Sequence, residues 1–310
     1  MARRKSLAFL DVGQGDCFVA DTKSGAIIFD GGSSSEDQVG RYRILPYMKY
    51  LGYQKIQIAV ISHMDIDHYS GIKELLEMGK IKYLGLPEIP KDATMKKIIG
   101  IAKKRGTTIF YLSRGRQITT KDGSLKVLHP QKNSQMEKNA ASLVMQGKIL
   151  GYRVLLTGDV EKEGEEELLS EELERADILK AAHHGSKNST SNEFLQKVQP
   201  KQTVISCGKQ NRYGHPHLET IHRLQTYRTK IYRTDRSGAI IFFQKKRWLK
   251  IFKKKGILSK AIERDAKNMK KILEDIKTNT YERFLSILRG RKIYDLPDEK
   301  PVKESISFRR

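Results

Sequence analysis

The sequence predicts an α/β fold of the sandwich type, followed by a basic and mainly helical extension. Short apolar segments rich in β-branched residues alternate with segments of helical spacing as far as residue 244. The chain of 310 residues is long enough to bury a large core in one domain. After residue 244 this pattern gives way to a run of basic residues. We therefore place one domain at residues 1–244 and the extension at residues 245–310.

In chain order, strands are expected in the first half at residues 7–12, 17–21, 26–29, 56–61, 81–86 and 107–112. Helices are expected there at residues 41–51, 72–78 and 95–104, and Pro46 should kink the first of them or mark its start. The second half is expected to form strands at residues 125–128, 152–156, 177–182, 203–207, 231–232 and 239–243. Its helices are expected at residues 161–174, 193–198 and 216–228.

Net charge is the strongest feature of the composition, because 59 Lys and Arg residues against 36 Asp and Glu residues give +23. This charge favours DNA, RNA or an anionic membrane surface as partner, although solvated lysine faces raise the charge in the same way. No apolar run approaches the length of a membrane span, and the apolar stretch after the basic N-terminus is too short for a secretory signal. We therefore expect a cytoplasmic protein without a transmembrane segment. Cys17 and Cys207 do not suggest a disulfide framework.

The segment SHMDIDHYSG, residues 62–71, is expected to be a loop between a buried strand and a short helix. It carries His63, Asp65, Asp67 and His68. Alternate residues of an extended segment point the same way, so the first three can converge while the turning chain brings in His68. A polar loop that solvates its own charges, or a His-Asp pair that caps the helix, is the alternative. Two imidazoles and two carboxylates within six residues favour a metal site.

The H-x-D-x-D-H pattern of this loop resembles the signature of the metallo-β-lactamase superfamily, in the variant with Asp at the second position. Together with DVGQGD, LLTGD, AAHHGS and NRYGHPH it resembles the C-terminal hydrolase domain of the ComEC family of competence proteins, over residues 6–244. The resemblance implies a four-layer αββα sandwich and a site for two divalent cations, Zn or Mn. The transmembrane portion that accompanies this domain in competence proteins has no counterpart here, so we do not expect this chain to carry DNA uptake alone.

Asp159 and the adjacent histidines His183 and His184 supply the other expected ligands. Asp159 follows a buried strand and Gly158, which suits a carboxylate that bridges two cations, although it also suits a cap of the following helix. One of the two histidines should complete the shell of the second cation, because neighbouring side chains on an extended segment diverge. The sequence does not say which of them does so.

Weaker candidates surround these ligands. Asn139 stands near the place where most relatives carry a ligating histidine, and it is either a weak ligand or a turn residue. The string GQGD alone would be a β-turn, whereas the resemblance places Asp11 and Asp16 in the wall of the site or behind its ligands. The segment from Asp30 to Gly32 is expected to be a hairpin turn, whereas the resemblance would place Asp30 beneath the metal loop.

The substrate contacts are expected from the loop at residues 208–217 and from Ser186. Asn211 and Tyr213 would donate hydrogen bonds to phosphate oxygens, and His215 would stabilise the developing charge or protonate the leaving oxygen. His217 is a weaker candidate than His215 for a contact with the substrate. The alternative is a polar loop that ends at Pro216 in the first turn of a helix.

The predicted function is that of a metal-dependent phosphodiesterase or nuclease, which cleaves DNA with a hydroxide activated by two metal ions. The catalytic roles are assigned to His215 and Asp67. A small-molecule metallohydrolase of the phosphocholine esterase or lactonase type, or a binding protein with a vestigial site, would fit the same motifs. The extension has basic residues interleaved with Trp248 and Phe252, and apolar residues at helical spacing over 269–288. It would bind nucleic acid, contact a membrane peripherally or pack on a second copy.

Overall fold

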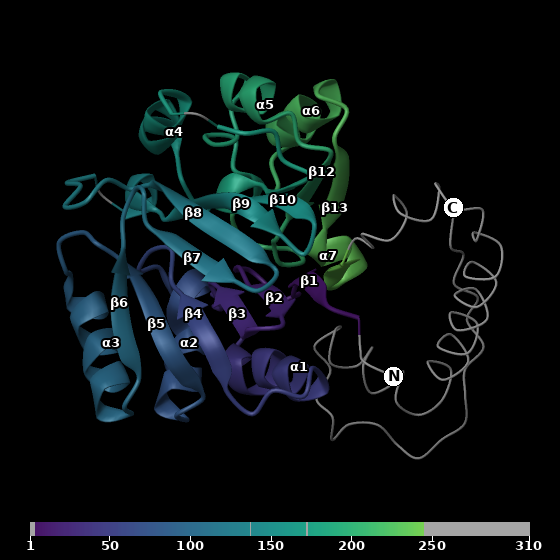
Figure 1. The fold of residues 1–310 in the computed structure, drawn as a ribbon. Coiled ribbons are helices and arrows are strands. Elements are labelled where there is room, and N and C mark those ends of the chain that lie inside the picture. Colours follow the sequence, from purple (N-terminus) through teal and green to yellow (C-terminus); the bar gives the residue numbers. More distant parts are fainter. Residues whose placement is uncertain (1–3, 137, 172, 245–310) are drawn as a thin grey trace, which may run out of the picture.

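The computed structural model describes residues 4–136, 138–171 and 173–244. Two mixed sheets of seven strands face each other, and helices cover their outer faces (Figure 1). The predicted four-layer αββα sandwich is therefore confirmed. The helical extension predicted for residues 245–310 lies outside the described residues.

The first sheet has the strand order β14-β1-β2-β3-β4-β5-β6. Its strands are β1 (Ser6–Phe9), β2 (Phe18–Thr22), β3 (Gly25–Phe29), β4 (Ile56–Val60), β5 (Ile81–Pro87), β6 (Thr108–Leu112) and β14 (Ile240–Phe243). The second sheet has the order β13-β12-β11-β10-β9-β8-β7. Its strands are β7 (Gln117–Thr120), β8 (Gly123–His129), β9 (Val144–Ile149), β10 (Tyr152–Leu156), β11 (Ile178–Lys180), β12 (Gln202–Ile205) and β13 (Lys230–Arg233).

The helices divide between the two sheets. The first sheet is covered by α1 (Leu45–Tyr50), α2 (Ile66–Glu77) and α3 (Ala93–Lys104), and the second by α4 (Lys162–Leu169), α5 (Asn192–Val198) and α6 (Leu218–Thr226). A short helix, α7 (Thr234–Ser237), precedes β14. No helix of the described residues combines the length and the apolar character that a membrane crossing requires.

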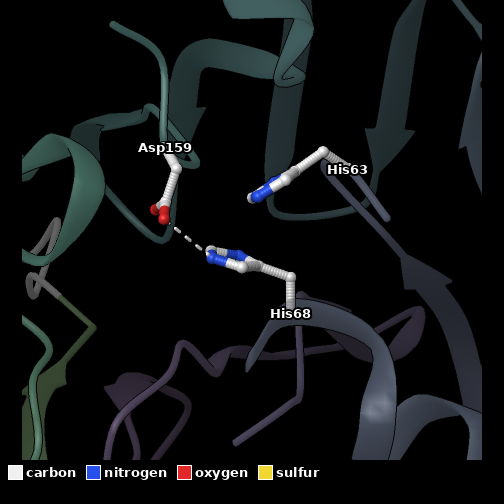
Figure 2. Close-up of side chains that lie close together, drawn as sticks. All are labelled: His63, His68 and Asp159. Carbon is white, nitrogen blue, oxygen red and sulfur yellow. Dashed lines mark ion pairs between the residues drawn. The ribbon is translucent and has the colours of Figure 1, made fainter. Parts of the chain in front are cut away.

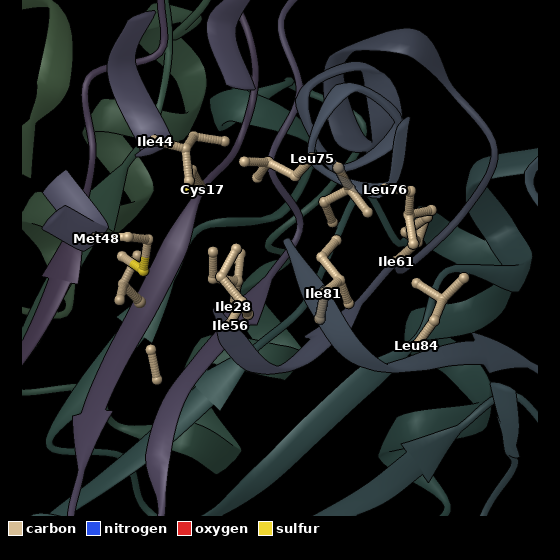
Figure 3. Packing of buried hydrophobic residues seen from close by; sticks show 14 of the residues in the cluster. Cys17, Ile28, Ile44, Met48, Ile56, Ile61, Leu75, Leu76, Ile81 and Leu84 are labelled. Carbon is tan, nitrogen blue, oxygen red and sulfur yellow. The ribbon is translucent and has the colours of Figure 1, made fainter. Parts of the chain in front are cut away.

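Burial on both faces of the strands produces the layers. In β1, Leu7 and Phe9 pack between the two sheets, whereas Ala8 faces the helices. Side chains such as Ile28 and Leu75 form the core between the first sheet and its helices (Figure 3). A third core joins the second sheet to α4, α5 and α6. Because successive residues of a strand point to opposite faces, a strand buried on both sides is mostly apolar on both faces, as in β1 and β3.

One expectation about helices was wrong, and one was confirmed in one of its two forms. Helix α2 begins at Ile66 rather than at residue 72, so Asp67 and His68 belong to its first turn and not to a loop. Ile66 is exposed, so the apolar periodicity does not reveal this turn. The segment around Pro46 consists of a π-helical turn, η1 (Gly40–Ile44), followed by α1, and the proline stands in the first turn of α1, as one of the two expectations had it.

Two strands and one turn were misjudged. β7 and β9 were not predicted, and β9 contains Gly147, whose missing side chain lets the backbone of Ser124 in β8 approach closely. The segment from Asp30 to Gly32 is not a hairpin turn, because β3 pairs with β4 in parallel. It instead packs on the first turn of α2, where the amide of Gly31 donates a hydrogen bond to the carbonyl of His68 at 2.8 Å.

Candidate metal centre

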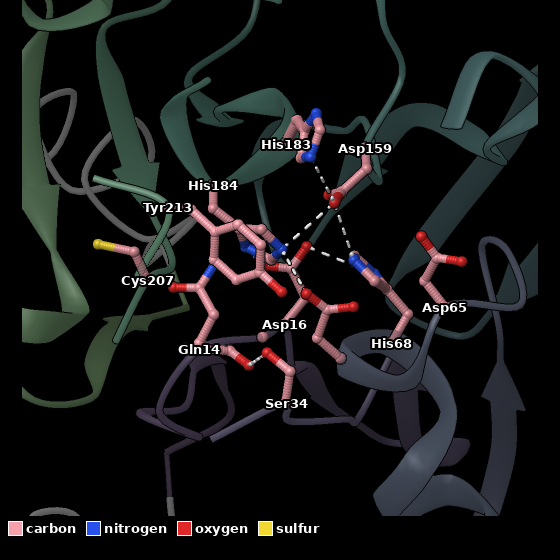
Figure 4. A network of polar contacts seen from close by, with 12 residues as sticks. Gln14, Asp16, Ser34, Asp65, His68, Asp159, His183, His184, Cys207 and Tyr213 are labelled. Atoms are coloured by element: carbon pink, nitrogen blue, oxygen red, sulfur yellow. Dashed lines mark hydrogen bonds and ion pairs between the residues drawn. The ribbon is translucent and has the colours of Figure 1, made fainter. Parts of the chain in front are cut away.

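The candidate metal centre lies where strands of both sheets end. Asp30 follows β3 and His63 follows β4 in the first sheet, whereas Asp159 follows β10 and His184 follows β11 in the second. Figure 4 shows His68, Asp159 and His184 converging from the two halves of the domain. Neither sheet alone supplies all of these residues, so the centre forms only when the two sheets are packed together.

His68 is held by carboxylates on both sides of its ring. It is fully buried, and its Nδ1 atom lies 3.0 Å from Oδ2 of Asp30. Its Nε2 atom lies 3.1 Å from Oδ2 of Asp159 (Figure 2). Asp30 is itself fixed, since its Oδ1 accepts a hydrogen bond from the amide of Ser62 at 2.7 Å. A proton on Nδ1 that is shared with Asp30 leaves Nε2 directed at the centre.

His63 lies beside His68, with the two ring centroids 4.1 Å apart. Its Nδ1 atom lies 2.9 Å from the hydroxyl of Ser62 and 3.3 Å from that of Ser142. Its Nε2 atom is buried and makes no hydrogen bond within the part of the chain that the structure describes. Ligand atoms of His63, His68 and Asp159 all lie within 4.8 Å of one another, so this group of three can hold a cation.

His184 forms a second group. The carbonyl of Ser206 accepts a hydrogen bond from its Nδ1 at 2.8 Å, which leaves Nε2 as the free ligand atom. That Nε2 lies 3.2 Å from Oδ2 of Asp159 and 3.3 Å from Oδ2 of Asp67. One oxygen of Asp159 therefore faces imidazoles of both groups.

His183 takes a different direction from its neighbour. Both histidines belong to a short turn, η3 (Ala182–Gly185), in which their φ angles are 48° and 52°. The prediction that this segment is extended was therefore wrong. Nε2 of His183 lies 3.9 Å from Oδ2 of Asp159, and its Nδ1 lies 2.8 Å from Oε1 of Glu161, a residue outside the motifs of the sequence. Of the two, His184 is thus the one seated against the shared carboxylate.

Lys180 is a second residue that sequence reasoning missed. It ends β11, is buried, and donates a hydrogen bond to the carbonyl of Gly158 at 2.7 Å. Its ammonium pairs with Asp16 and lies 3.3 Å from Oδ1 of Asp159. The available signal was a lysine at the end of a strand of otherwise apolar residues.

The buried charges shift one another's pKa values. Burial opposes the imidazolium form of His68 and of His184, but the carboxylate of Asp159 and its neighbours outweigh burial and raise both pKa values well above 6.5. Burial likewise opposes the anion of Asp159, yet His184 and His68 hold its pKa well below the usual value. Against burial, His184 lowers the pKa of Asp67 to about 2. The acidic centre therefore attracts positive charge, as protons or as metal ions.

These residues fit divalent cations. Imidazole nitrogens and carboxylate oxygens are ligands that both Zn and Mn accept. His63, His68 and Asp159 would hold one cation. Asp67 and His184 would hold another with Asp159 shared, since Nε2 of His184 lies 3.3 Å from Asp67 and 3.2 Å from Asp159. Nε2 of His63 supports this assignment, because it is buried and has no hydrogen bond among the described residues, which is costly without a ligand.

The remaining ligand candidates lie at the margin. Asp65 is the N-cap of α2, with 54% of its side chain exposed and Oδ2 3.6 Å from Nε2 of His63. Asp11 accepts a hydrogen bond from the amide of Gly13, and it joins no group of ligand atoms among the residues that the structure describes. Oδ1 of Asn139 is buried and, among the described residues, has no hydrogen-bond partner.

Three of the expected substrate contacts are occupied locally. The side-chain amide of Asn211 bonds both the amide and the carbonyl of His215, so it shapes the loop. The hydroxyl of Ser186 accepts a hydrogen bond from the amide of Asn188. His217 is the N-cap residue of α6, and its Nδ1 accepts from the amide of Lys187.

A cleft of 250 Å³ opens onto the candidate metal centre. It is lined by Gln14, Asp65, Ile66, Asp67, Asp159, His183, His184, Tyr213 and His215. Tyr213 is 41% exposed and stacks on His215, with centroids 5.6 Å apart, while the guanidinium of Arg212 lies 4.9 Å from the tyrosine centroid. Burial and then the charge of His184 lower the pKa of His215 to about 4, so this imidazole is neutral near pH 7.

Close packing at Gly32 fixes the first turn of α2. A Cβ at this position would lie 2.5 Å from the carbonyl oxygen of Ile66 and 2.6 Å from the amide nitrogen of His68. We expect Gly32→Ala to destabilise the fold by about 1–3 kcal/mol and to weaken cation binding, because the turn that carries His68 has to move. Urea unfolding and metal titration measure the two effects.

Gly100→Ala is the matched control. Gly100 lies in α3 and is exposed, and a Cβ at that position would meet no atom of a neighbouring element within 4 Å. We expect a gain of roughly 0.5–1 kcal/mol there, since alanine is the better helix former. An unfolding midpoint of Gly32→Ala equal to that of the unaltered protein would contradict the packing argument.

Comparison with known proteins agrees with the geometry. Residues 10–209 match the metallo-beta-lactamase superfamily. The chain is 36% identical over 257 residues to ComE operon protein 3 of Bacillus subtilis (strain 168), and 30% identical over 239 residues to competence protein ComA of Neisseria gonorrhoeae. These matches cover 77% and 75% of this chain but 33% and 31% of those proteins, so the chain spans about a third of their length.

A solved structure supports the same fold. The metallo-beta-lactamase fold protein YhfI from Bacillus subtilis is similar with a TM-score of 0.52 at 13% identity, over 78% of this chain and 100% of that chain. The sandwich of two mixed sheets and the match over residues 10–209 lead to one conclusion: this chain belongs to the metallo-beta-lactamase superfamily.

Proposed function

We propose that this domain is a metal-dependent phosphodiesterase or nuclease that cleaves DNA with two divalent cations, Zn or Mn. The observation that carries the proposal is the position of Asp159. Its Oδ2 lies 3.1 Å from Nε2 of His68 and 3.2 Å from Nε2 of His184, so one carboxylate serves two groups of ligand atoms. Two-cation sites suit in-line displacement at phosphorus, as in phosphatases and nucleases.

Membership of the superfamily supports a metal-dependent hydrolase. Two further observations favour DNA as the substrate. One of the relatives reported above is named a competence protein, and the net charge of +23 suits a polyanion. We propose that the basic run after residue 244 adds to this attraction by binding DNA.

The residues of this chain would divide the work as follows. When bound, the cations would supply a hydroxide at neutral pH and offset the charge of the phosphate. Asp30 and the carbonyl of Ser206 orient His68 and His184 through their Nδ1 atoms. His215, neutral near pH 7 because its pKa is about 4, would donate a hydrogen bond to a phosphate oxygen rather than act as a proton-donating acid.

Tyr213 and Arg212 would bind substrate at the mouth of the cleft. The guanidinium of Arg212 donates a hydrogen bond to the hydroxyl of Tyr213 at 2.8 Å, and both side chains are exposed. A guanidinium and a phenolic hydroxyl held together in this way present donors to a phosphate group.

A second candidate is a small-molecule metallohydrolase, of the phosphocholine esterase or lactonase type. The observation that favours it is the size of the cleft, since 250 Å³ is below the usual range for a drug-sized ligand and suits a compact substrate.

Cleavage of labelled single- and double-stranded DNA distinguishes these functions. The purified protein would be loaded with Mn or Zn, and a chelator would serve as the blank. We expect cutting that needs the metal and weakens with added salt, because phosphate contacts are salt-sensitive. A metal-loaded protein that leaves both DNA forms intact while it hydrolyses a small phosphodiester or a lactone would favour the second candidate.

A further inference from the structure

A lysine inside an acidic metal centre needs an explanation. Lys180 is 4% exposed, although its ammonium is strongly hydrated when it lies in water. Its partners are the carboxylates of Asp16 and Asp159 and the carbonyl of Gly158. A buried charge with this set of partners is a fixed part of the site and not a surface group that was covered by chance.

The two oxygens of Asp159 have different neighbours, and Lys180 contacts only one of them in an ion pair. Oδ1 lies 3.3 Å from the ammonium, whereas Oδ2 faces the Nε2 atoms of His68 and His184 at 3.1 and 3.2 Å. The ammonium thus restricts which oxygen Asp159 offers to a cation. The resulting ligand is a carboxylate that binds through Oδ2.

Asp16 lies on the other side of the imidazoles. Its oxygens are 3.7 Å from Nδ1 of His68 and 3.6 Å from Nδ1 of His184, away from the Nε2 atoms that face the shared carboxylate. Asp16 is paired with Lys180, and it faces the Nδ1 atoms of His68 and His184. The pair carries no net charge; its ammonium lies 3.3 Å from Oδ1 of Asp159, and an oxygen of Asp16 lies within 4.8 Å of an oxygen of Asp159.

The ammonium of Lys180 must act on cation affinity through charge. A unit charge a few ångströms from a divalent cation is poorly screened in a buried site, so it changes the affinity for that cation. Several carboxylates supply negative charge to the centre, among them Asp16, Asp67 and Asp159, and Lys180 offsets one unit of it. The centre accordingly attracts divalent cations less strongly than its carboxylates alone would.

We propose that Lys180 is an internal counter-cation of the metal centre, which fixes Asp159 for binding through Oδ2 and lowers the affinity for divalent cations. It is a positioning residue, because it acts through Asp159 and Asp16 and not on the substrate. The inference rests on the proposed function insofar as the centre binds metal.

A charge-removal cycle tests it by titration calorimetry with Mn in the absence of DNA. Lys180→Met should bind the more weakly held Mn about tenfold more tightly or better, because a positive charge has gone. Asp16→Asn should bind Mn about tenfold more weakly, because Lys180 is then uncompensated. The double variant Asp16→Asn, Lys180→Met should return to within about threefold of the unaltered protein.

Two controls separate charge from structure. Lys180→Gln keeps a donor for the carbonyl of Gly158 but lacks the charge, so it should bind Mn as Lys180→Met does. Lys201→Met removes a lysine that pairs with Asp177 at 3.0 Å on the same sheet, and it should leave Mn binding unchanged. Circular dichroism shows which variants are folded.

The outcomes separate the inference from the function on which it rests. Folded Lys180→Met and Lys180→Gln proteins that bind Mn no more tightly than the unaltered protein would overturn the counter-cation. Absence of Mn or Zn binding by the unaltered protein would overturn the metal centre itself, and the counter-cation with it. Mn binding that follows the cycle, without DNA cleavage, would support the counter-cation and reject only the nuclease.

Discussion

Replacing Asp159 by Asn is expected to abolish the DNA cleavage proposed above, with a loss in kcat of about 10³-fold or more. The substitution keeps the shape of the side chain but removes the negative charge that faces the Nε2 atoms of His68 and His184. A neutral amide is a poor bridge between two cations. Its NH₂ group is only a donor, so it cannot replace the carboxylate oxygen as a ligand. Metal content, measured by atomic emission after dialysis, should fall together with the rate.

Asp122→Asn is the matched control for this experiment. Asp122 is also a buried carboxylate, but it accepts a hydrogen bond from the amide of Lys23 in a turn that contains none of the candidate ligands. The control should retain both metal and rate. An Asp159→Asn protein that is folded, binds two cations and cuts at the unaltered rate would refute the bridging role.

Cation binding is expected to strengthen steeply with pH. In the metal-free protein the pKa values of His68 and His184 lie well above 6.5, so both imidazoles are protonated at pH 6.5 and cannot bind metal through Nε2. Each proton released raises the apparent affinity about tenfold per pH unit, so two protons give a slope of up to about a hundredfold per unit. Calorimetry in buffers of different ionisation enthalpy counts the protons directly.

The same pKa shifts set the pH dependence of stability without metal. A histidine whose pKa is higher in the folded state adds stability that is fully present below pH 6.5 and is lost as the pH rises through the folded pKa. The metal-free protein should therefore unfold at lower urea concentration on the alkaline side, and added Mn should restore the midpoint there. Cation affinity that stays constant from pH 6 to pH 8 would contradict both expectations.

The fold was largely predictable from sequence because its strands are buried on both faces. Segments such as residues 56–61 and 152–156 are mostly apolar, with Gln57 and Arg153 as exceptions, so they stand out without any tertiary information. β9 did not stand out, since polar Gln146 and Lys148 and the flexible Gly147 interrupt it, and pairing with β8 and β10 makes it a strand. Tertiary contacts decided its conformation, which local propensity cannot anticipate.

The candidate centre was predictable in its residue types but not in its geometry. The positions of His63 and Asp159 at strand ends followed from apolar runs that stop before them. The left-handed turn at His183 and His184 did not, because nothing in that stretch other than Gly185 signals a positive φ. Lys180 was overlooked since a lysine in a strand is ordinarily exposed, and only the meeting of two sheets buries this one.

The origin of the ligands in both sheets has a consequence for how the protein acquires its metal. His63 and His68 belong to the first sheet and its helix, whereas Asp159 and His184 arrive from the second, far along the chain. A nascent chain that has made only its first half presents an incomplete set of ligands. Metal uptake is then a late step that follows docking of the halves, and the free energy of binding is added to a fold already formed. Each bound ion would thereafter resist separation of the two sheets.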